Sequence, residues 1–222
     1  MIFITFEGPE GSGKTSILEK LKERLWKEGL AVIATREPGG SVISEQIRQI
    51  ILNKTHKTMD PWTEVLLYVA ARRQHLEEKI FPEKNSKKII ICDRFSDSTV
   101  AYQGYGRKLD INKINKIQEI AFDNFEPNLT IFFDVDPKIG LKRIWKRKFL
   151  LNHKHDRLDK EDLEFHERVY QGYKTIAKHN KDRIKIVNAN QKFNEVFEEV
   201  YKLIKIFIEK NNYQTLVKNL RV

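Results

Sequence analysis

A short glycine-rich loop near the start of the chain carries the clearest chemistry. It reads Gly8-Pro9-Glu10-Gly11-Ser12-Gly13-Lys14-Thr15 and fits the pattern G-x-x-x-x-G-K-[ST]. Its glycines allow backbone N–H groups to converge on phosphate oxygens at a helix N-terminus, where the helix dipole favours negative charge. Lys14 is then expected at the β- and γ-phosphates, and the Thr15 hydroxyl at magnesium. The loop therefore predicts binding of a nucleoside triphosphate, but ATPases, GTPases and kinases share this pattern.

An acidic residue and several arginines are candidates to complete such a site. Asp93 follows an apolar run, so a parallel sheet would bring its carboxylate near the loop, where it could hold magnesium through water; the alternative is an aspartate that caps a turn. Arg94 could pair with Asp93 or project toward a second phosphate. Six arginines are dispersed along the chain: Arg36, Arg48, Arg72, Arg73, Arg94 and Arg107. Dispersed arginines favour an anion pocket over a nucleic-acid groove, in which basic and aromatic residues usually alternate along one face.

Five short runs rich in β-branched residues alternate with helical patterns and would position these groups. The runs are Ile2–Phe6, Leu30–Thr35, Lys88–Cys92, Leu129–Asp134 and Arg183–Asn188. Several are apolar at consecutive positions, as strands buried on both faces are, and the alternation indicates βαβ crossovers. We predict an α/β fold with a five-stranded parallel sheet flanked by helices on both faces. The most regular helical pattern, from Phe193 to Ile208, should pack against this sheet.

Length and composition fit one globular domain. We expect this domain to occupy residues 1–210 of the 222, and we assign no role to residues 211–222. The net charge of +10 is compatible with nucleic acid, membrane headgroups or small phosphorylated ligands, but many lysines lie beside glutamates at helical spacing, as on a solvated surface. The one cysteine, Cys92, should pack as a small hydrophobe. Without a signal peptide or a membrane span, we expect a soluble cytoplasmic protein.

Taken together, the motifs resemble those of the thymidylate kinases, bacterial type. The resemblance rests on the loop with its acidic third residue and on these further strings: Thr35-Arg36-Glu37-Pro38-Gly39-Gly40, Leu66-Leu67-Tyr68, Ala71-Arg72-Arg73-Gln74-His75, Asp93-Arg94, Ser98-Thr99-Val100-Ala101-Tyr102-Gln103-Gly104 and Asp156-Arg157-Leu158. Their number, order and spacing, from Ile2 to about Ile208, make the match specific. The resemblance implies a P-loop nucleoside monophosphate kinase fold. It also implies ATP and dTMP as substrates, dTDP as product for dTTP synthesis, magnesium bound with ATP, and a homodimer.

The same resemblance implies an acceptor site for dTMP. Its residues would be Glu10, Glu37, Pro38, Arg48, Tyr68, Arg72, Arg94, Ser98, Thr99, Tyr102 and Gln103. The three arginines would hold the acceptor side, with Arg72 also a candidate for a contact with the base, and Glu10 would approach the 3′-hydroxyl. Ser98, Thr99 and Gln103 would face the polar edge of thymine, and Tyr102 would exclude a 2′-hydroxyl.

Two positions in this acceptor set leave alternatives open. Tyr68 stands where the family usually has a phenylalanine that stacks on thymine, and without the family context it would be a structural aromatic. Glu37-Pro38-Gly39-Gly40 also has the composition of a simple turn, and the sequence does not decide whether the bond before Pro38 is cis.

A basic segment at about residues 143–157 resembles the mobile lid of the family. The P-loop has no arginine, so the resemblance makes Arg143, Arg147 and Arg157 the candidates to neutralise the donor phosphates; the alternative is a solvated helix face. With Lys14 and Arg94 they form the candidate catalytic set. For magnesium we predict Thr15 and Asp93, and we find no zinc pattern among His75, His153 and His155.

The predicted reaction is a direct in-line transfer without a covalent enzyme intermediate. Positioning and charge stabilisation would carry it, with closure excluding water. We expect no nucleic acid or membrane partner. The alternatives are a kinase for another nucleoside monophosphate or for a deoxynucleoside, and a non-catalytic nucleotide-binding module attached to nucleic acid through the positive charge.

Overall fold

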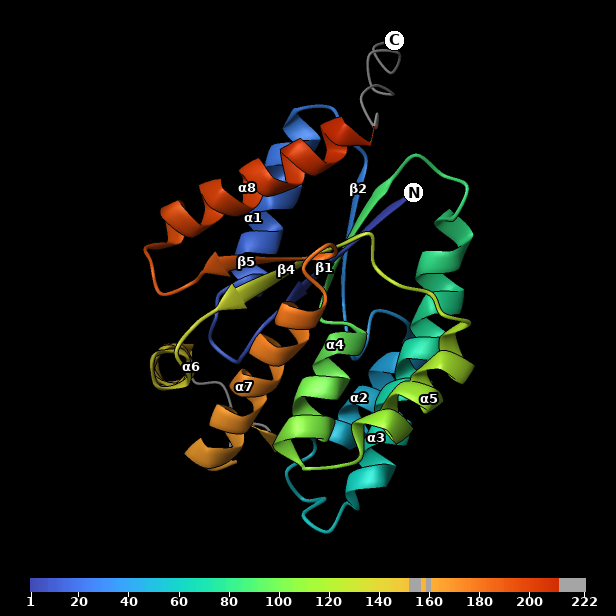
Figure 1. Cartoon of the computed structure of the whole chain (residues 1–222), viewed down its shortest axis with the longest axis vertical. Coiled ribbons are helices and arrows are strands. Elements are labelled where there is room, and N and C mark those ends of the chain that lie inside the picture. Colours follow the sequence, from blue (N-terminus) through green and yellow to red (C-terminus); the bar gives the residue numbers. More distant parts are fainter. Residues whose placement is uncertain (152–156, 159–160, 212–222) are drawn as a thin grey trace.

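Five parallel strands form one sheet at the centre of the computed structural model, which describes residues 1–151, 157–158 and 161–211 (Figure 1). The sheet has the order β2-β3-β1-β4-β5. The strands are β1 (Ile2–Glu7), β2 (Val32–Arg36), β3 (Ile89–Asp93), β4 (Leu129–Asp134) and β5 (Ile184–Asn188). The predicted fold class is confirmed, and each predicted strand is found with its ends shifted by no more than two residues.

Two helices cover one face of the sheet. They are α1 (Lys14–Lys27) and α8 (Phe193–Lys210), and they enclose the largest apolar cluster against alternate residues of the strands. The predicted periodicity of α8 is confirmed, because Val196, Val200, Ile204 and Ile208 are buried at helical spacing. Phe193, at the start of the pattern, is instead 43% exposed. Burying this apolar stripe fixes α8 against the sheet.

The opposite face carries the remaining layer of helices. They are α2 (Val42–Leu52), α3 (Pro61–His75), α4 (Ser96–Thr99), α5 (Ile111–Phe122) and α7 (Leu163–His179), with three short segments: the π-helical η1 (Leu76–Ile80), the 3-10 helix η2 (Phe81–Glu83) and the π-helical η3 (Val100–Gly106). Aspartates cap α3, α5 and α7 at their N-termini: Asp60, Asp110 and Asp162 each accept a hydrogen bond from the backbone of the first turn. Such a cap stabilises a helix by about 1 kcal/mol.

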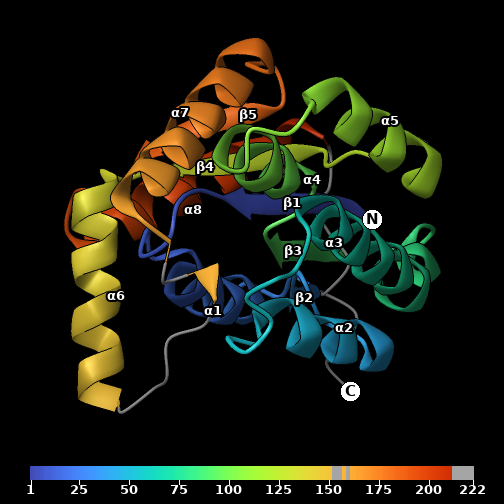
Figure 2. The same ribbon diagram turned by 90° about the horizontal axis from the view of Figure 1, so that it is seen from below.

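The topology places several loops at one edge of the sheet. The central strand β1 pairs with β3 on one side and β4 on the other, and the register aligns Phe6 with Asp93. In open parallel sheets, ligands bind beyond the carboxyl ends of the strands where the chain order reverses. Helix α6 (Pro137–Leu151) lies to one side of this edge and α2 and α3 to the other (Figure 2). None of the described helices is long and apolar enough to cross a membrane.

Candidate functional site

The glycine loop joins β1 to α1 and packs directly on α6. Gly13 is the N-cap of α1, so the free N–H groups of the first helical turn face the loop. Gly11 has φ +72°, and a side chain there would overlap the carbonyl oxygen of Gly140 on α6. Glycine is therefore required at this point, both for the backbone conformation and for the close approach of the two segments.

Lys14 is folded back onto the loop that contains it. Its ammonium donates to the carbonyl oxygens of Gly8 and Pro9, each at 3.0 Å, and to Ser12 Oγ at 2.9 Å. Burial and the nearby Arg94 guanidinium lower its pKa to about 8. A cation held in this way can exchange its partners for phosphate oxygens at small cost, because all three are neutral acceptors.

The two residues predicted to hold magnesium lie in contact. Thr15 Oγ1 donates to Asp93 Oδ2 at 2.5 Å, across 78 residues of sequence. Hydroxyl and carboxylate oxygens are ligands that Mg²⁺ accepts when nucleotide phosphates and waters complete its shell. The donor set therefore fits the ion.

Arg94 is the most heavily bonded cation near the loop. Its Nη2 donates to Glu10 Oε1 at 2.6 Å and to Tyr102 Oη at 3.0 Å, while Nη1 donates to Gly8 O at 2.9 Å. Its ion pair is thus with Glu10 rather than Asp93. Burial opposes ionisation of Glu10, but Arg94 and Lys14 more than offset this and lower its pKa to about 2.

The backbone of Arg94 lies in the left-handed region, with φ 75°. Such a conformation costs a non-glycine residue about 1–3 kcal/mol and persists only when neighbouring groups hold it. Here Arg94 N donates to Phe6 O at 2.9 Å, and the Cys92 thiol donates to Arg94 O at 3.1 Å. The expected role of Cys92 as a buried residue is confirmed, and its thiol also supports this turn.

Glu7 is a buried carboxylate that the sequence did not single out. It accepts hydrogen bonds from Phe95 N and Ser98 Oγ, both at 2.6 Å, and from Tyr173 Oη at 3.0 Å. Burial and the neighbouring Asp97 raise its pKa to about 7. Because the Ser98 hydroxyl donates to Glu7, Ser98 can only accept from a ligand.

A cavity of about 240 Å³ opens between the loop, α2, α3 and η3. Its lining includes all eleven residues of the predicted acceptor set: Glu10, Glu37, Pro38, Arg48, Tyr68, Arg72, Arg94, Ser98, Thr99, Tyr102 and Gln103. Gly11 to Thr15, Asp93 and Arg147 line it too. The Glu37–Pro38 bond is cis, and Arg48 Nη1 donates to Pro38 O at 2.7 Å. The fold thus gathers residues separated by 93 positions around one space large enough for a small ligand.

Arg72 is 2% exposed and has a nearly complete set of hydrogen bonds. Its Nε donates to Glu37 Oε2 at 2.5 Å, and Nη2 donates to Phe95 O at 2.9 Å. Nη1 donates to Thr99 Oγ1 and Gln118 Oε1, at 3.0 and 2.8 Å. A guanidinium has five N–H groups, so within the described part of the chain these bonds leave one N–H on Nη2 for the cavity.

Gln103 is oriented by a buried acid on α3. Its Nε2 donates to Glu64 Oε1 at 2.7 Å, and an ionised carboxylate can only accept, so the amide oxygen of Gln103 is left for the cavity. Burial opposes ionisation of Glu64, but Arg107 and Arg157 more than compensate and lower its pKa. Tyr68, which also lines the cavity, has its pKa raised by burial and by Glu64.

The three predicted lid arginines have different surroundings. Arg143 Nη1 donates to Ala189 O at 2.8 Å and lines a second hollow, of about 540 Å³, on the other side of the loop. Arg147 lines both hollows. Arg157 lines neither, because its guanidinium pairs with Glu64 and donates to Ile51 O at 3.0 Å. In this structure Arg157 is thus engaged with α2 and α3, and its role at the donor phosphates stays a prediction.

The structure leaves several predicted positions untested. His153, His155 and Asp156 lie outside the described residues, as do residues 212–222. Sequence reasoning also missed Glu7, Glu64 and Tyr173, which orient cavity residues from behind. For Glu7 the available signal was an acid at the end of the largely apolar strand β1, since a buried carboxylate requires partners.

Comparisons with a family model, with curated proteins and with solved structures all find thymidylate kinases similar to this chain. The family model described as thymidylate kinase matches residues 6–200. A thymidylate kinase from Clostridium novyi is 49% identical over 203 residues, which is 91% of this chain and 98% of that one. One from a Geobacillus species is 52% identical over 195 residues, covering 88% and 91%. The crystal structure of thymidylate kinase from Ehrlichia chaffeensis superposes with a TM-score of 0.73, at 34% identity and covering 92% and 98%.

Proposed function

The chain belongs to the thymidylate kinase family, and from that premise we propose how its residues divide the work between donor and acceptor. The enzyme phosphorylates dTMP with ATP, which yields the dTDP needed for dTTP synthesis. The observation that carries the proposed arrangement is the gathering of all eleven acceptor candidates around one cavity beside the P-loop.

We assign the donor to the P-loop and the hollow beyond it. The triphosphate lies against the N-terminus of α1, with Lys14 at its β- and γ-phosphates and the nucleoside toward Arg143. Thr15 and Asp93 would hold Mg²⁺, which neutralises phosphate charge when it is bound with ATP. Arg147, which lines both hollows, is placed to act between donor and acceptor.

We assign the acceptor to the cavity of about 240 Å³. Arg48 and Arg94 hold the 5′-phosphate, and Glu10 accepts from the 3′-hydroxyl. The remaining N–H of Arg72 donates to a carbonyl of thymine, and the amide oxygen of Gln103 accepts from its N3–H. The ring of Tyr68 stacks on the base, and that of Tyr102 occupies the space that a 2′-hydroxyl would need.

The proposed chemistry is a direct in-line transfer. No general base is required, because the acceptor phosphate is already ionised at neutral pH. The two polyanions would repel each other in water, so the protein's task is to bring them together with cations and to exclude water. Lys14, Arg94 and the lid arginines Arg143 and Arg147 supply positive charge in the part of the chain that the structure describes. Arg157 supports the acceptor side through Glu64.

We further propose a cytoplasmic homodimer in which residues 1–210 form the catalytic domain and residues 143–157 the lid. Two adjacent helices, α2 and α3, carry apolar side chains that are exposed in the single chain: Val42, Ile43, Ile50 and Leu66. Apolar side chains grouped in this way are typical of a surface that a second subunit covers.

A coupled assay of diphosphate formation tests the proposal. With magnesium and ATP, the protein should convert dTMP to dTDP at a rate that saturates in both substrates. Lys14→Ala should lower kcat by about 10²–10³-fold, as expected for loss of one group that stabilises transferring charge. Full activity in Lys14→Ala would contradict the donor assignment, and an absence of dTDP with the wild type would contradict the acceptor assignment.

A further inference from the structure

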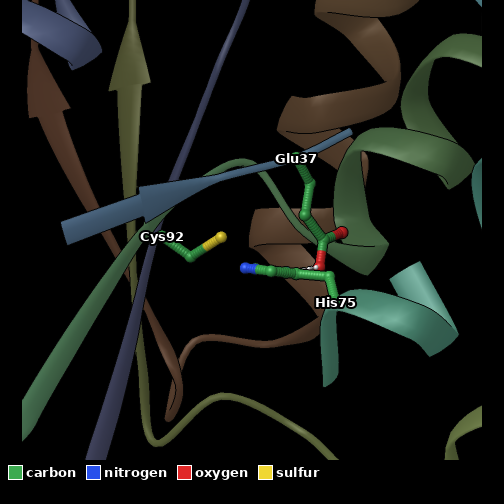
Figure 3. Close-up of side chains that lie close together, drawn as sticks. All are labelled: Glu37, His75 and Cys92. Atoms are coloured by element: carbon green, nitrogen blue, oxygen red, sulfur yellow. Dashed lines mark hydrogen bonds and ion pairs between the residues drawn. The ribbon is translucent and has the colours of Figure 1, made fainter. Parts of the chain in front are cut away.

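Two polar residues without a role in the proposed function, the half-buried Thr35 and the buried His75, belong to a hydrogen-bonded row that lies behind Arg72. It runs from Thr35 at the end of β2 through His75 at the end of α3 to Glu37, whose carboxylate reaches Arg72. His75 is 0% and Glu37 4% exposed. Figure 3 shows the imidazole of His75 beside the carboxylate of Glu37. Only Glu37 and Arg72 of this row line the acceptor cavity.

Each polar atom of the row has one defined partner. Glu37 Oε2 accepts from Arg72 Nε at 2.5 Å, and Oε1 lies 2.8 Å from His75 Nδ1. His75 Nε2 lies 2.7 Å from Thr35 Oγ1. Glu37 is held on its backbone side too, because its N–H donates to Asp93 O at 3.0 Å. The carboxylate that fixes the Arg72 guanidinium is thus itself fixed at both oxygens.

The direction of these hydrogen bonds follows from the carboxylate. A carboxylate paired with a guanidinium is ionised and can only accept, so Nδ1 of His75 must carry a hydrogen. When the ring is neutral, its Nε2 accepts from the Thr35 hydroxyl. The carboxylate of Glu37 thus selects the Nδ1–H tautomer, and the hydroxyl of Thr35 adapts to it.

Cys92 completes the group in Figure 3 but takes no part in the row. Glu37, His75 and Cys92 each offer one potential ligand atom, and these three atoms lie within 4.8 Å of one another. Burial raises the pKa of the Cys92 thiol well above its usual value, and the thiol donates to Arg94 O at 3.1 Å. Since the Arg72 cation also lies against Glu37, the cluster is a hydrogen-bonded support and not a cation site.

Gly40 packs against the outer side of the row. It has φ +85°, and a side chain at this position would come within 2.7 Å of His75 Nε2 and of Thr35 Oγ1. The backbone at Gly40 therefore closes over the hydrogen bond between Thr35 and His75. The close approach of Gly40 to His75 and Thr35 therefore requires a glycine at this position, which a simple turn would not.

We propose that His75 is a positioning residue for recognition of the acceptor base. Together with Thr35 it fixes Glu37, and Glu37 holds Arg72 so that its last N–H stays available to a carbonyl of the pyrimidine. This inference rests on the proposed function, in which the base of dTMP occupies the cavity beside Arg72. It assigns a role to a buried histidine that touches no substrate.

Removing the ring should weaken base recognition and leave phosphoryl transfer intact. In His75→Leu, Glu37 Oε1 loses its donor while buried, so the carboxylate and Arg72 reorient. We expect KM for dTMP to rise about tenfold, with kcat and KM for ATP changed by less than about twofold. The Kd of thymidine, which lacks the phosphate, should rise by the same factor as that of dTMP, because the defect lies at the base.

Three further variants separate positioning from general damage. His75→Asn places an amide nitrogen near the position of Nδ1 and should restore KM for dTMP to within about threefold of the wild type. Thr35→Val removes only the outer hydrogen bond, should give a smaller rise in KM, and keeps the test open if His75→Leu does not fold. Ile80→Val, a change in η1 within an apolar cluster that also contains Leu76, should lower thermal stability without changing KM for dTMP.

Nitrogen-15 NMR of labelled histidine supplies a readout independent of turnover. The wild type should show His75 with its hydrogen on Nδ1, and Thr35→Val should shift the Nε2 resonance. The inference is overturned if folded His75→Leu binds dTMP and thymidine as the wild type does, or if its losses fall equally on ATP. A wild-type enzyme that fails to use dTMP would instead refute the proposed function.

Discussion

Lys14 makes all of its hydrogen bonds to neutral acceptors within its own loop. Burial and Arg94 lower its pKa to about 8, so about half of the unliganded molecules lack this charge at pH 8. The phosphates of ATP favour the charged form and should raise the pKa. Binding of ATP is therefore expected to take up about 0.5 proton at pH 8, and the affinity should fall as pH rises further.

Isothermal titration in two buffers of different ionisation enthalpy measures this proton uptake directly. Lys14→Met keeps the bulk of the side chain and cannot titrate. Its proton uptake on binding ATP should therefore be about 0.5 proton smaller than that of the wild type. Equal uptake by the two proteins would show that another group titrates and would refute the assignment to Lys14.

Glu7 makes stability depend on pH in the opposite sense to most acidic residues. Its pKa is raised from 4.5 to about 7 in the folded chain, so its stabilising contribution is complete below pH 4.5 and is lost as pH rises through 7. The shift corresponds to about 3 kcal/mol of unfolding free energy. Glu7→Gln imitates the protonated form and should remove this loss.

Urea unfolding of both proteins at pH 5 and pH 8 checks the prediction. The wild type should lose more stability over this interval than Glu7→Gln, by about 2.5 kcal/mol, because part of the loss already occurs below pH 5. Glu23→Gln, at an exposed position of α1, should retain the wild-type difference. A Glu7→Gln variant with the same pH dependence as the wild type would contradict the role given to the buried carboxylate.

At the scale of elements, the contact between the P-loop and α6 couples the donor loop to the helix that carries Arg143 and Arg147. A side chain at Gly140 would overlap Glu10 O. Gly140→Ala should therefore displace α6, even though alanine favours the helix by about 1 kcal/mol. We expect kcat/KM for ATP to fall at least about tenfold, by analogy with other misplaced positioning groups.

Steady-state kinetics with a thermal melt distinguishes this effect from unfolding. Ile139→Ala, which alters a 40% exposed side chain on the same helix, is the control and should keep near-normal kinetics. Normal kcat/KM for ATP in Gly140→Ala would show that the glycine contact does not position the lid arginines.

The elements were predictable where one local rule decides them. Runs such as Ile89 to Cys92 are short, rich in β-branched residues and apolar at every position, as is typical of a strand covered on both faces. The π-helical η3 was not foreseen, because π-helical turns are rare and no local pattern in this segment indicates one.

The acceptor candidates other than Arg48 lie in the motif strings, and the fold brings all eleven to one cavity. The residues that orient these candidates could not be predicted from the sequence. Gln103 depends on Glu64, and Ser98 depends on Glu7, across 39 and 91 residues. The contact of Arg157 with Glu64 could not be foreseen either, since the two residues lie 93 positions apart and nothing local indicates the pair. Long-range pairs of buried charges follow from topology and leave no periodic signal.

At the scale of the whole molecule, the exposed apolar side chains of α2 and α3 predict association. Leu66 on α3 is 54% exposed, and a charge there would be costly if a second subunit covers it. Leu66→Glu should shift the protein from dimer to monomer in sedimentation velocity. Ile206→Glu, at a 51% exposed position on α8 across the sheet, should remain dimeric. A monomeric wild type, or a dimeric Leu66→Glu, would contradict this interface.

The central claim is that the cavity beside the P-loop selects dTMP as the acceptor of the ATP γ-phosphoryl group. An internal competition tests it most directly: equal concentrations of dTMP, dUMP, dCMP, dAMP, dGMP and UMP are incubated with magnesium, ATP and the enzyme, and the diphosphates are quantified by mass spectrometry at low conversion. Product ratios then equal the ratios of kcat/KM. We expect dTDP to predominate and UDP and dCDP to be the least formed pyrimidine products. Formation of another diphosphate in excess of dTDP, or of all six in similar amounts, would contradict it.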